Sequence, residues 1–117
     1  MGNYRKLNVW IRAKELCIKI YYLTDKDPFR KNIFLQSQIR RASFSIPSNI
    51  AEGEESGSNN QSLRFFRYAK ASLAETLTQL EIAYDIGFLE QNEFLEIQKE
   101  YEILSKMIYK IISYRSK

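Results

Sequence analysis

The feature that most constrains the fold is the spacing of apolar residues toward the C-terminal end of the chain. They recur at alternating intervals of three and four residues, at Phe94, Ile97, Tyr101, Leu104, Ile108 and Ile111. An α-helix with this spacing buries one stripe against partner helices. The pattern therefore predicts a helix that other helices of the chain must cover.

Three earlier segments carry stripes of the same kind. Together with the last one, they predict four helices at about 8–23, 34–54, 60–86 and 91–114. Strands have little support, because β-branched alternation is absent. The connections are short, so neighbouring helices must run antiparallel. We expect an all-α, up-down-up-down four-helix bundle that occupies residues 1–117 as a single domain.

Local signals mark several helix ends. Asn8 can cap the first helix, and either Ser58 or Asn59 the third, because their side-chain oxygens accept backbone N–H groups. Gly87 follows the third helix in the position of a C-cap glycine. Pro47 interrupts the second stripe, and the alternatives are a kinked continuous helix and two short helices. We expect the kinked helix, since the apolar spacing stays in phase across Pro47.

Charge is unevenly distributed along the chain. The net charge is +4, yet residues 1–53 carry ten Lys/Arg against four Asp/Glu, and residues 71–105 carry one against eight. The expected topology brings both termini and the 54–60 connector to one end, which should be basic, and leaves the opposite end more acidic. The candidate nucleic-acid-binding residues at the basic end are Arg5, Lys6, Arg12, Arg64, Arg67, Lys110, Arg115 and Lys117. Basic residues with interleaved aromatics would suit a phosphate backbone, although ordinary solvation of a helical bundle explains them equally well.

The sequence offers little for catalysis. It has no histidine, which excludes the Glu-x-x-His pairs of di-iron bundles and any His-based triad or zincin site. Glu52 and Glu75 could form an acid/base pair, but structural carboxylates paired with Arg40 or Arg41 are the simpler interpretation. We therefore expect a protein that is not an enzyme and that uses no metal and no cofactor.

The single cysteine, Cys17, lies on an apolar helical face. It is expected to be a small core residue rather than a reactive thiol. One cysteine cannot form an intramolecular disulfide, which favours a reducing compartment. No apolar run approaches the roughly 20 residues that span a bilayer, and the N-terminal segment does not have the pattern of a signal peptide. We expect a cytoplasmic protein without a membrane partner.

Two adjacent arginines stand out in the second helix. Arg40 and Arg41 point about 100° apart, so both cannot share one face, and either could be structural or could face a ligand. The expected register across the connector places Arg41 near Leu73, within reach of Ser72 or Glu75. We expect a structural ion pair for at least one of the two arginines.

Asn49 is flanked by Ile46 and Ile50 and should be at least partly buried. A buried amide needs hydrogen-bond partners. Asn49 therefore either fixes the helix register near Pro47 or binds the connector between the second and third helices.

The stretch at 38–53 reads Q-I-R-R-A-S-F-S-I-P-S-N-I-A-E-G. It resembles the signature of the S23 family, the four-helix-bundle proteins encoded within intervening sequences of bacterial 23S rRNA genes, which is approximately Q-I-R-R-A-x-x-S-I-P-x-N-I-A-E-G. Downstream, A-K-A-S-L-A-E at 69–75 is similar to the family's A-x-G-S-x-x-E, with Ala71 where Gly is common. The signature residues that match are Gln38, Arg40, Arg41, Ser45, Pro47, Asn49, Glu52, Gly53, Ser72 and Glu75.

This resemblance implies a homopentamer, a barrel of bundles around a central channel. It also implies kinship with the accessory protein of diversity-generating retroelements, which binds RNA and a reverse transcriptase. Aromatic residues that the four stripes leave over, such as Phe44, Tyr22 and Tyr109, fit an oligomer. The leading hypothesis is a non-enzymatic, oligomeric, RNA-associated protein; the alternative is an oligomeric scaffold that binds a protein partner and no nucleic acid.

Overall fold

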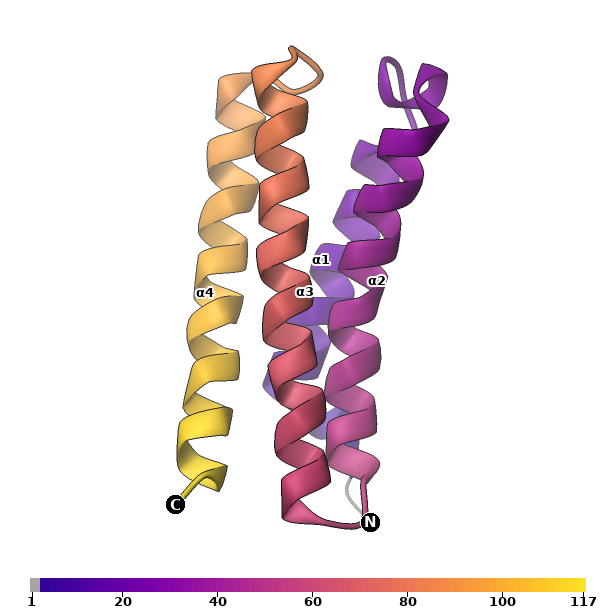
Figure 1. Ribbon diagram of the computed structural model, residues 1–117. Coiled ribbons are helices and arrows are strands. Elements are labelled where there is room, and N and C mark those ends of the chain that lie inside the picture. Colours follow the sequence, from indigo (N-terminus) through magenta and orange to yellow (C-terminus); the bar gives the residue numbers. More distant parts are fainter. Residues whose placement is uncertain (1–2) are drawn as a thin grey trace.

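The computed structural model describes residues 3–117, which form four α-helices in the predicted order (Figure 1). Every predicted helix boundary is met within one residue, and the described residues contain no strand. Two short 3-10 turns, η1 (Tyr4–Lys6) and η2 (Phe29–Lys31), were not expected. The helices are α1 (Asn8–Leu23), α2 (Ile33–Glu55), α3 (Asn59–Asp85) and α4 (Gln91–Arg115).

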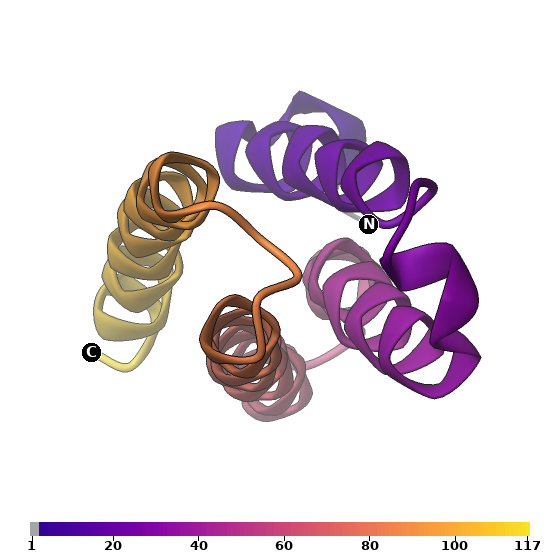
Figure 2. The ribbon, with the colours of Figure 1, turned by 90° about the horizontal axis from the view of Figure 1, so that it is seen from above.

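The four helices run alternately up and down along an elongated molecule of 43 × 21 × 20 Å. Both chain ends and the α2–α3 connector lie at one end, and the α1–α2 and α3–α4 connections lie at the other (Figure 1). Viewed along its axis, the bundle places one helix at each of four corners (Figure 2). The contact between α2 and α3 is the most extensive of the helix pairs, and that between α1 and α4 is the smallest.

Side-chain caps begin three of the helices. The Asn32 side chain accepts the Leu35 N–H at 3.0 Å, and the Ser58 side chain accepts the Gln61 N–H at 3.2 Å. Glu90 and Glu93 form a capping box at the start of α4. The predicted Asn8 cap is wrong, because Leu7 occupies the cap position of α1 and Asn8 is already helical.

The end of α3 follows the predicted glycine stop. Gly87 has a φ of +87°, which the absence of a Cβ makes inexpensive. The Phe88 N–H donates to the Ala83 carbonyl at 2.8 Å, and the Gly87 N–H donates to the Tyr84 carbonyl at 3.0 Å. These two bonds form a Schellman motif, which satisfies carbonyls that the helix end leaves free.

Pro47 lies inside one unbroken helix, so the prediction of a continuous helix rather than two short ones is confirmed, and the kink stays a prediction. Hydroxyl and amide side chains around it bond to nearby carbonyls of the same helix. Ser48 Oγ donates to the Phe44 carbonyl at 2.9 Å, and Asn49 Nδ2 donates to the Ser45 carbonyl at 2.8 Å. The continuous helix lets one face of α2 stay in contact with α1 and α3 on both sides of the proline.

The predicted apolar stripes meet in a single core. Tyr101, Phe66 and Leu104 are at most 1 % exposed. Phe29 of η2 packs edge-on against Phe88 with ring centroids 5.4 Å apart, which closes the core at the end away from the termini. Because each helix buries one stripe, the remaining face of each helix is available to other functions.

Candidate nucleic-acid interface

The end of the bundle that bears the termini, here called the basic pole, comprises residues 3–12, 50–68 and 108–117. It carries eight Lys/Arg against three Glu, and these eight are the predicted nucleic-acid-binding residues. The opposite end, residues 19–37 and 80–99, carries five Lys/Arg against seven Asp/Glu. The fold therefore turns the uneven charge of the sequence into two poles of opposite sign.

Most of the basic side chains at this pole face solvent. Arg12 is half-buried, and Arg115 is held inside the pole as described below. Two guanidinium groups lie over aromatic rings of neighbouring residues: Arg5 is 4.8 Å from the Tyr4 ring centroid, and Arg64 is 5.9 Å from that of Phe65. The exposed residues are Arg5, Lys6, Arg64, Arg67, Lys110 and Lys117.

Arg115 ties the last turn of α4 to the α2–α3 connector. Its guanidinium donates to Glu54 Oε1 at 2.7 Å and to Ser62 Oγ at 3.2 Å, and it lies 5.0 Å from the ring centroid of Phe66. The Asn59 side-chain amide donates to the Arg115 carbonyl at 2.9 Å. Because its charge is already neutralised by Glu54, Arg115 acts here as a structural group.

The first turn of α3 adds backbone donors to the basic pole. A shallow hollow of about 460 Å³ lies beside it, lined by Ser58, Asn60, Gln61 and Arg64. The N-terminus of a helix carries a partial positive charge and free N–H groups. Exposed side-chain cations and this helix end therefore act in the same direction on a nearby anion.

Among the signature residues, Arg40 caps the end of α1. Its Nε donates to Thr24 Oγ1 at 2.8 Å, its Nη2 donates to the Tyr21 carbonyl at 3.1 Å, and its guanidinium lies 4.1 Å from the Tyr21 ring centroid. An ion pair joins it to Asp25 at 3.6 Å. The expectation of a structural ion pair is confirmed for Arg40, but its partner is Asp25 rather than Glu75.

Arg41 points away from the core. It is exposed and forms no ion pair in residues 3–117; Glu52 and Glu75 share this property. The predicted position of Arg41 is wrong by about one turn. Ser45 bonds to Ser72 across the helix pair, which places Arg41 level with residue 76 and not with Leu73.

A small polar network joins α2 to α3. Ser45 Oγ accepts from Ser72 Oγ at 3.1 Å and from Asn49 Nδ2 at 3.0 Å. All three side chains are half-buried. The prediction that Asn49 is partly buried is confirmed. Its amide donates to Ser45 of its own helix and not to the connector, so the bond that crosses from α2 to α3 is made by Ser45 and Ser72.

Gly53 marks the closest approach of α2 to α3. A Cβ at this position would lie 3.1 to 3.2 Å from three atoms of the buried Phe66 ring. A side chain would therefore need the ring to move. Gln38, the first signature residue, is half-buried and forms no hydrogen bond through its side chain within the described chain.

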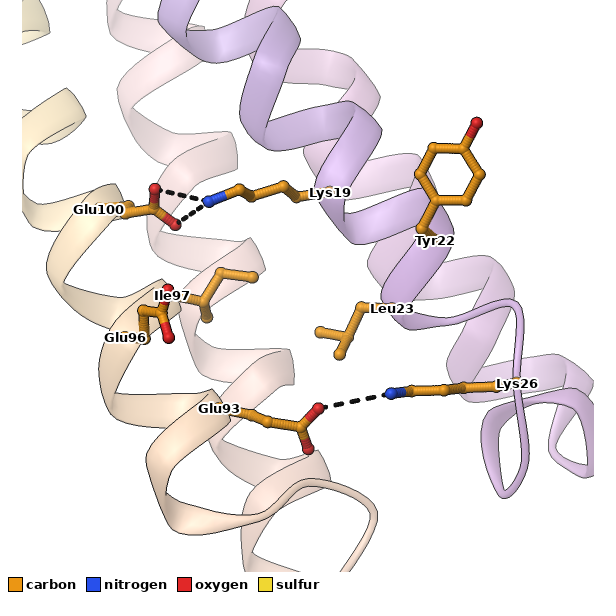
Figure 3. Close-up of a pocket in the computed structure, with 8 residues that line it drawn as sticks. All are labelled: Lys19, Tyr22, Leu23, Lys26, Glu93, Glu96, Ile97 and Glu100. Atoms are coloured by element: carbon orange, nitrogen blue, oxygen red, sulfur yellow. Dashed lines mark hydrogen bonds and ion pairs between the residues drawn. The ribbon is translucent and has the colours of Figure 1, made fainter.

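The gap between α1 and α4 is bridged by surface ion pairs (Figure 3). Lys19 Nζ lies 2.8 and 3.0 Å from the two oxygens of Glu100, and Lys26 Nζ lies 3.5 Å from Glu93. Leu23 and Ile97 line the pocket of about 310 Å³ between them. Hydrogen bonding to Glu100 raises the pKa of Lys19, against the smaller effect of desolvation.

Two buried titratable groups lie in the core, Cys17 on α1 and Tyr101 on α4. Burial raises the pKa of the Cys17 thiol, which lies 3.8 Å from Ser43 Oγ, so Cys17 is the core residue predicted. Burial also raises the pKa of the Tyr101 phenol, whose hydroxyl has no hydrogen-bond partner among residues 3–117. Within residues 3–117 no group of His, Cys, Asp and Glu could hold a metal ion. No helix in that range has the length and apolar character needed to cross a membrane.

Sequence reasoning missed Thr24 and Gln36. Thr24 is fully buried at the end of α1, where its hydroxyl donates to the Ile20 carbonyl at 2.7 Å and accepts from Arg40. Gln36 Nε2 donates to the Thr24 carbonyl at 2.7 Å. The only sequence signal was a threonine directly after an apolar stripe, which is also common in turns.

Comparison with known proteins supports the same fold. The family model described as "23S rRNA-intervening sequence protein" matches residues 5–110. A crystal structure of a protein with unknown function from the S23 ribosomal protein family of Bacteroides thetaiotaomicron superposes with a TM-score of 0.82. It is 22% identical and covers 89% of this chain and 97% of its own. The search of curated proteins finds no significant match.

Proposed function

Because this chain belongs to the 23S rRNA-intervening sequence protein family, we propose that it is a non-enzymatic, oligomeric protein that associates with RNA through its basic pole. We further propose that the oligomer is a homopentamer and that the protein acts in the cytoplasm, where the free thiol of Cys17 stays reduced. The observation that carries the proposal is the separation of charge into two poles.

Phosphate binding depends on how many cations can reach the backbone at once. The basic pole offers exposed cations from η1, α3 and α4 on one end of the molecule. Each protomer of an oligomer would add its own set, so weak single contacts would sum. This mode of binding reads shape and charge and needs no base-specific pocket.

The test is a gel-shift titration on a structured RNA over a series of salt concentrations. The variant Lys6→Glu/Arg67→Glu/Lys110→Glu reverses three exposed charges of the basic pole. We expect it to lose binding at moderate salt and to lower the slope of log K against log salt by about 2–3.

The matched control reverses three exposed charges at the other pole, Arg30→Glu/Lys31→Glu/Lys99→Glu. It changes the net charge equally and should bind as the wild type does, apart from a general weakening by long-range charge. An equal loss of RNA binding in both variants would mean that net charge alone, and not the basic pole, determines binding. If the wild type does not bind RNA at low salt, RNA association is rejected.

A second candidate function is an oligomeric scaffold that binds a protein such as a reverse transcriptase. The observation that favours it is the number of large apolar side chains on the surface, among them Tyr22 and Tyr114, which are 70% and 73% exposed. A scaffold of this kind would bind its partner equally well at low and moderate salt and would not bind RNA.

A further inference from the structure

The outward side of α2 is a stripe that the core leaves uncovered. Here called the α2 face, it is exposed throughout and mixes apolar, polar and oppositely charged residues. Phe34 and Phe44 are 74% and 52% exposed. The stripe consists of Phe34, Ser37, Arg41, Phe44, Ser48 and Glu52.

The outward side of α3 has a matching composition. This α3 face is also exposed along its whole length, with aromatic and aliphatic residues, a small alanine and one charge of each sign. Neither of its charged residues, Arg64 and Glu75, forms an ion pair in residues 3–117. The stripe consists of Arg64, Tyr68, Ala71, Glu75, Thr78 and Ile82, and it is continued by the exposed C-cap residue Ile86.

The two faces also match in position along the bundle axis. Since Ser45 bonds to Ser72, residues of α2 and α3 whose numbers add to about 117 lie at one height. Arg41 is then level with Thr76, one residue from Glu75. The positive charge of Arg41 on the α2 face therefore lies at nearly the same height as the negative charge of Glu75 on the α3 face.

The second charge and the apolar residues obey the same rule. Glu52 is level with Phe65, one residue from Arg64. Phe34 is level with Ala83, one residue from Ile82. One constant offset therefore aligns two pairs of opposite charges and an apolar pair.

We propose that the α2 face docks against the α3 face of a second copy of this chain, with the two bundles side by side and parallel. The contact pairs Arg41 with Glu75 and Glu52 with Arg64 of the neighbour. It rests on the oligomer of the proposed function and specifies its interface. The observation behind it is charge complementarity between two faces whose charges form no ion pair among the residues that the structure describes.

The position of the two faces favours a closed ring. α2 and α3 occupy adjacent corners of the bundle (Figure 2), and the residues of both faces are exposed. Two different surfaces that meet in every contact form a heterologous interface, which gives a ring where the rotation between neighbours closes and an open filament where it does not. In the parallel arrangement all basic poles lie on one rim of the ring.

An antiparallel contact between two α2 faces is the competing arrangement. There Arg41 of each copy would meet Glu52 of the other, because these residues lie on the same face of α2, eleven residues apart. It would give a two-fold dimer whose basic poles point in opposite directions. The two arrangements differ in the second substitution that should restore self-association of Arg41→Glu: Glu75→Arg in the parallel contact and Glu52→Arg in the antiparallel one.

The test measures oligomer mass and dissociation constant by light scattering and sedimentation. We expect Arg41→Glu to weaken self-association by roughly 10- to 100-fold, because it sets two like charges against each other. The double variant Arg41→Glu/Glu75→Arg should restore it. The control Lys106→Glu changes an exposed residue of α4 and should leave the mass unchanged.

Each other outcome overturns the proposal. Rescue by Glu52→Arg instead of Glu75→Arg would establish the antiparallel dimer. Unchanged association of Arg41→Glu would reject this interface and leave the oligomer of the proposed function intact, whereas a monomeric wild type would reject both. Circular dichroism checks folding, and Glu75→Arg alone serves if Arg41→Glu misfolds, since it sets two arginines together.

Discussion

The α2–α3 contact and the α1–α4 contact hold one bundle together by different means. Between α2 and α3, Gly53 receives the Phe66 ring, and Ser45 bonds to Ser72 across the pair. Between α1 and α4, ion pairs at the surface bridge a pocket, and the hydroxyl of Tyr101 is buried without a partner. The first contact depends on close shape complementarity, and the second on long, flexible side chains.

The difference shows that the α2–α3 contact restricts the amino-acid sequence more strongly than the α1–α4 contact does. Close packing tolerates few substitutions, because a single added methyl must displace a neighbour. An exposed ion pair contributes little and is screened by salt. The signature residues follow this division: Ser45, Asn49, Gly53 and Ser72 all belong to the α2–α3 contact or border it, and none bridges α1 to α4.

The largest expected effect comes from Phe66→Ala, which leaves a cavity in the α2–α3 contact near the connector between the two helices. Phe66 is 1% exposed and packs against Gly53 and under Arg115. We expect a loss of about 3–5 kcal/mol in the free energy of unfolding. Urea denaturation at fixed protein concentration measures it, with Tyr22→Ala, at a 70% exposed position, as a control that should change little. Similar losses in both variants would contradict the comparison.

Gly53→Ala should have the next largest effect. The added Cβ meets the Phe66 ring at 3.1 Å, and overpacking of this kind costs roughly 1–3 kcal/mol. The better helix propensity of alanine returns up to about 1 kcal/mol. We expect a net loss of about 1–2 kcal/mol by urea denaturation. In the double variant with Phe66→Leu the cost should shrink; strict additivity would show that the ring is not the obstacle.

Tyr101→Phe should stabilise the α1–α4 contact. Removing a buried hydroxyl that has no partner should gain about 1 kcal/mol. The pKa of Tyr101 is raised above 10.0, so above that pH the unfolded chain loses a proton that the native state keeps. Wild-type stability should therefore fall with rising pH above 10.0, by up to about 1.4 kcal/mol per pH unit, and this contribution should vanish in the variant.

The exposed Tyr109→Phe is the matched control, and it should not show the gain in stability. Urea titrations at pH 7 and above pH 10 measure both effects. A loss of stability in Tyr101→Phe at pH 7 would mean that the hydroxyl has a partner, such as a bound water.

The smallest effect is expected from Lys19→Ala, which removes one ion pair between α1 and α4. Lys19 is about half exposed, so the loss should be about 0.2–1 kcal/mol and smaller still at high salt. Since its pKa is raised, the contribution is present at pH 7 and disappears as pH rises above 10.5. Melting at low and high salt measures it, with Lys106→Ala as control; a salt-independent loss above 2 kcal/mol would contradict the assignment.

Helix positions could be predicted from the sequence because apolar spacing and local end signals agree. Gly87 stops α3 where the stripe ends, and the stripe of α2 stays in phase through Pro47. The register between α2 and α3 could not be predicted in the same way. The Phe66 ring packs against Gly53, and this contact between two helices fixes their register. Counting residues across the 54–60 connector cannot predict it.

The candidate site was predictable in its charge and not in its contacts. Topology alone gathers the eight basic residues at one pole. Glu54 neutralises Arg115, and Arg40 donates to the Tyr21 carbonyl and to Thr24 at the end of α1. Both arrangements depend on side chains brought together from separate helices. Sequence distance gives no measure of such pairs.

The α1–α4 contact has a consequence for the order of folding. The α1–α2, α2–α3 and α3–α4 hairpins join neighbours in the chain, whereas α1 and α4 are its most distant helices. Contacts across long loops form late, because closing the loop costs entropy before any contact is gained. We therefore expect α1 and α4 to meet last during folding, and amide protons on their facing sides to exchange with solvent before those between α2 and α3.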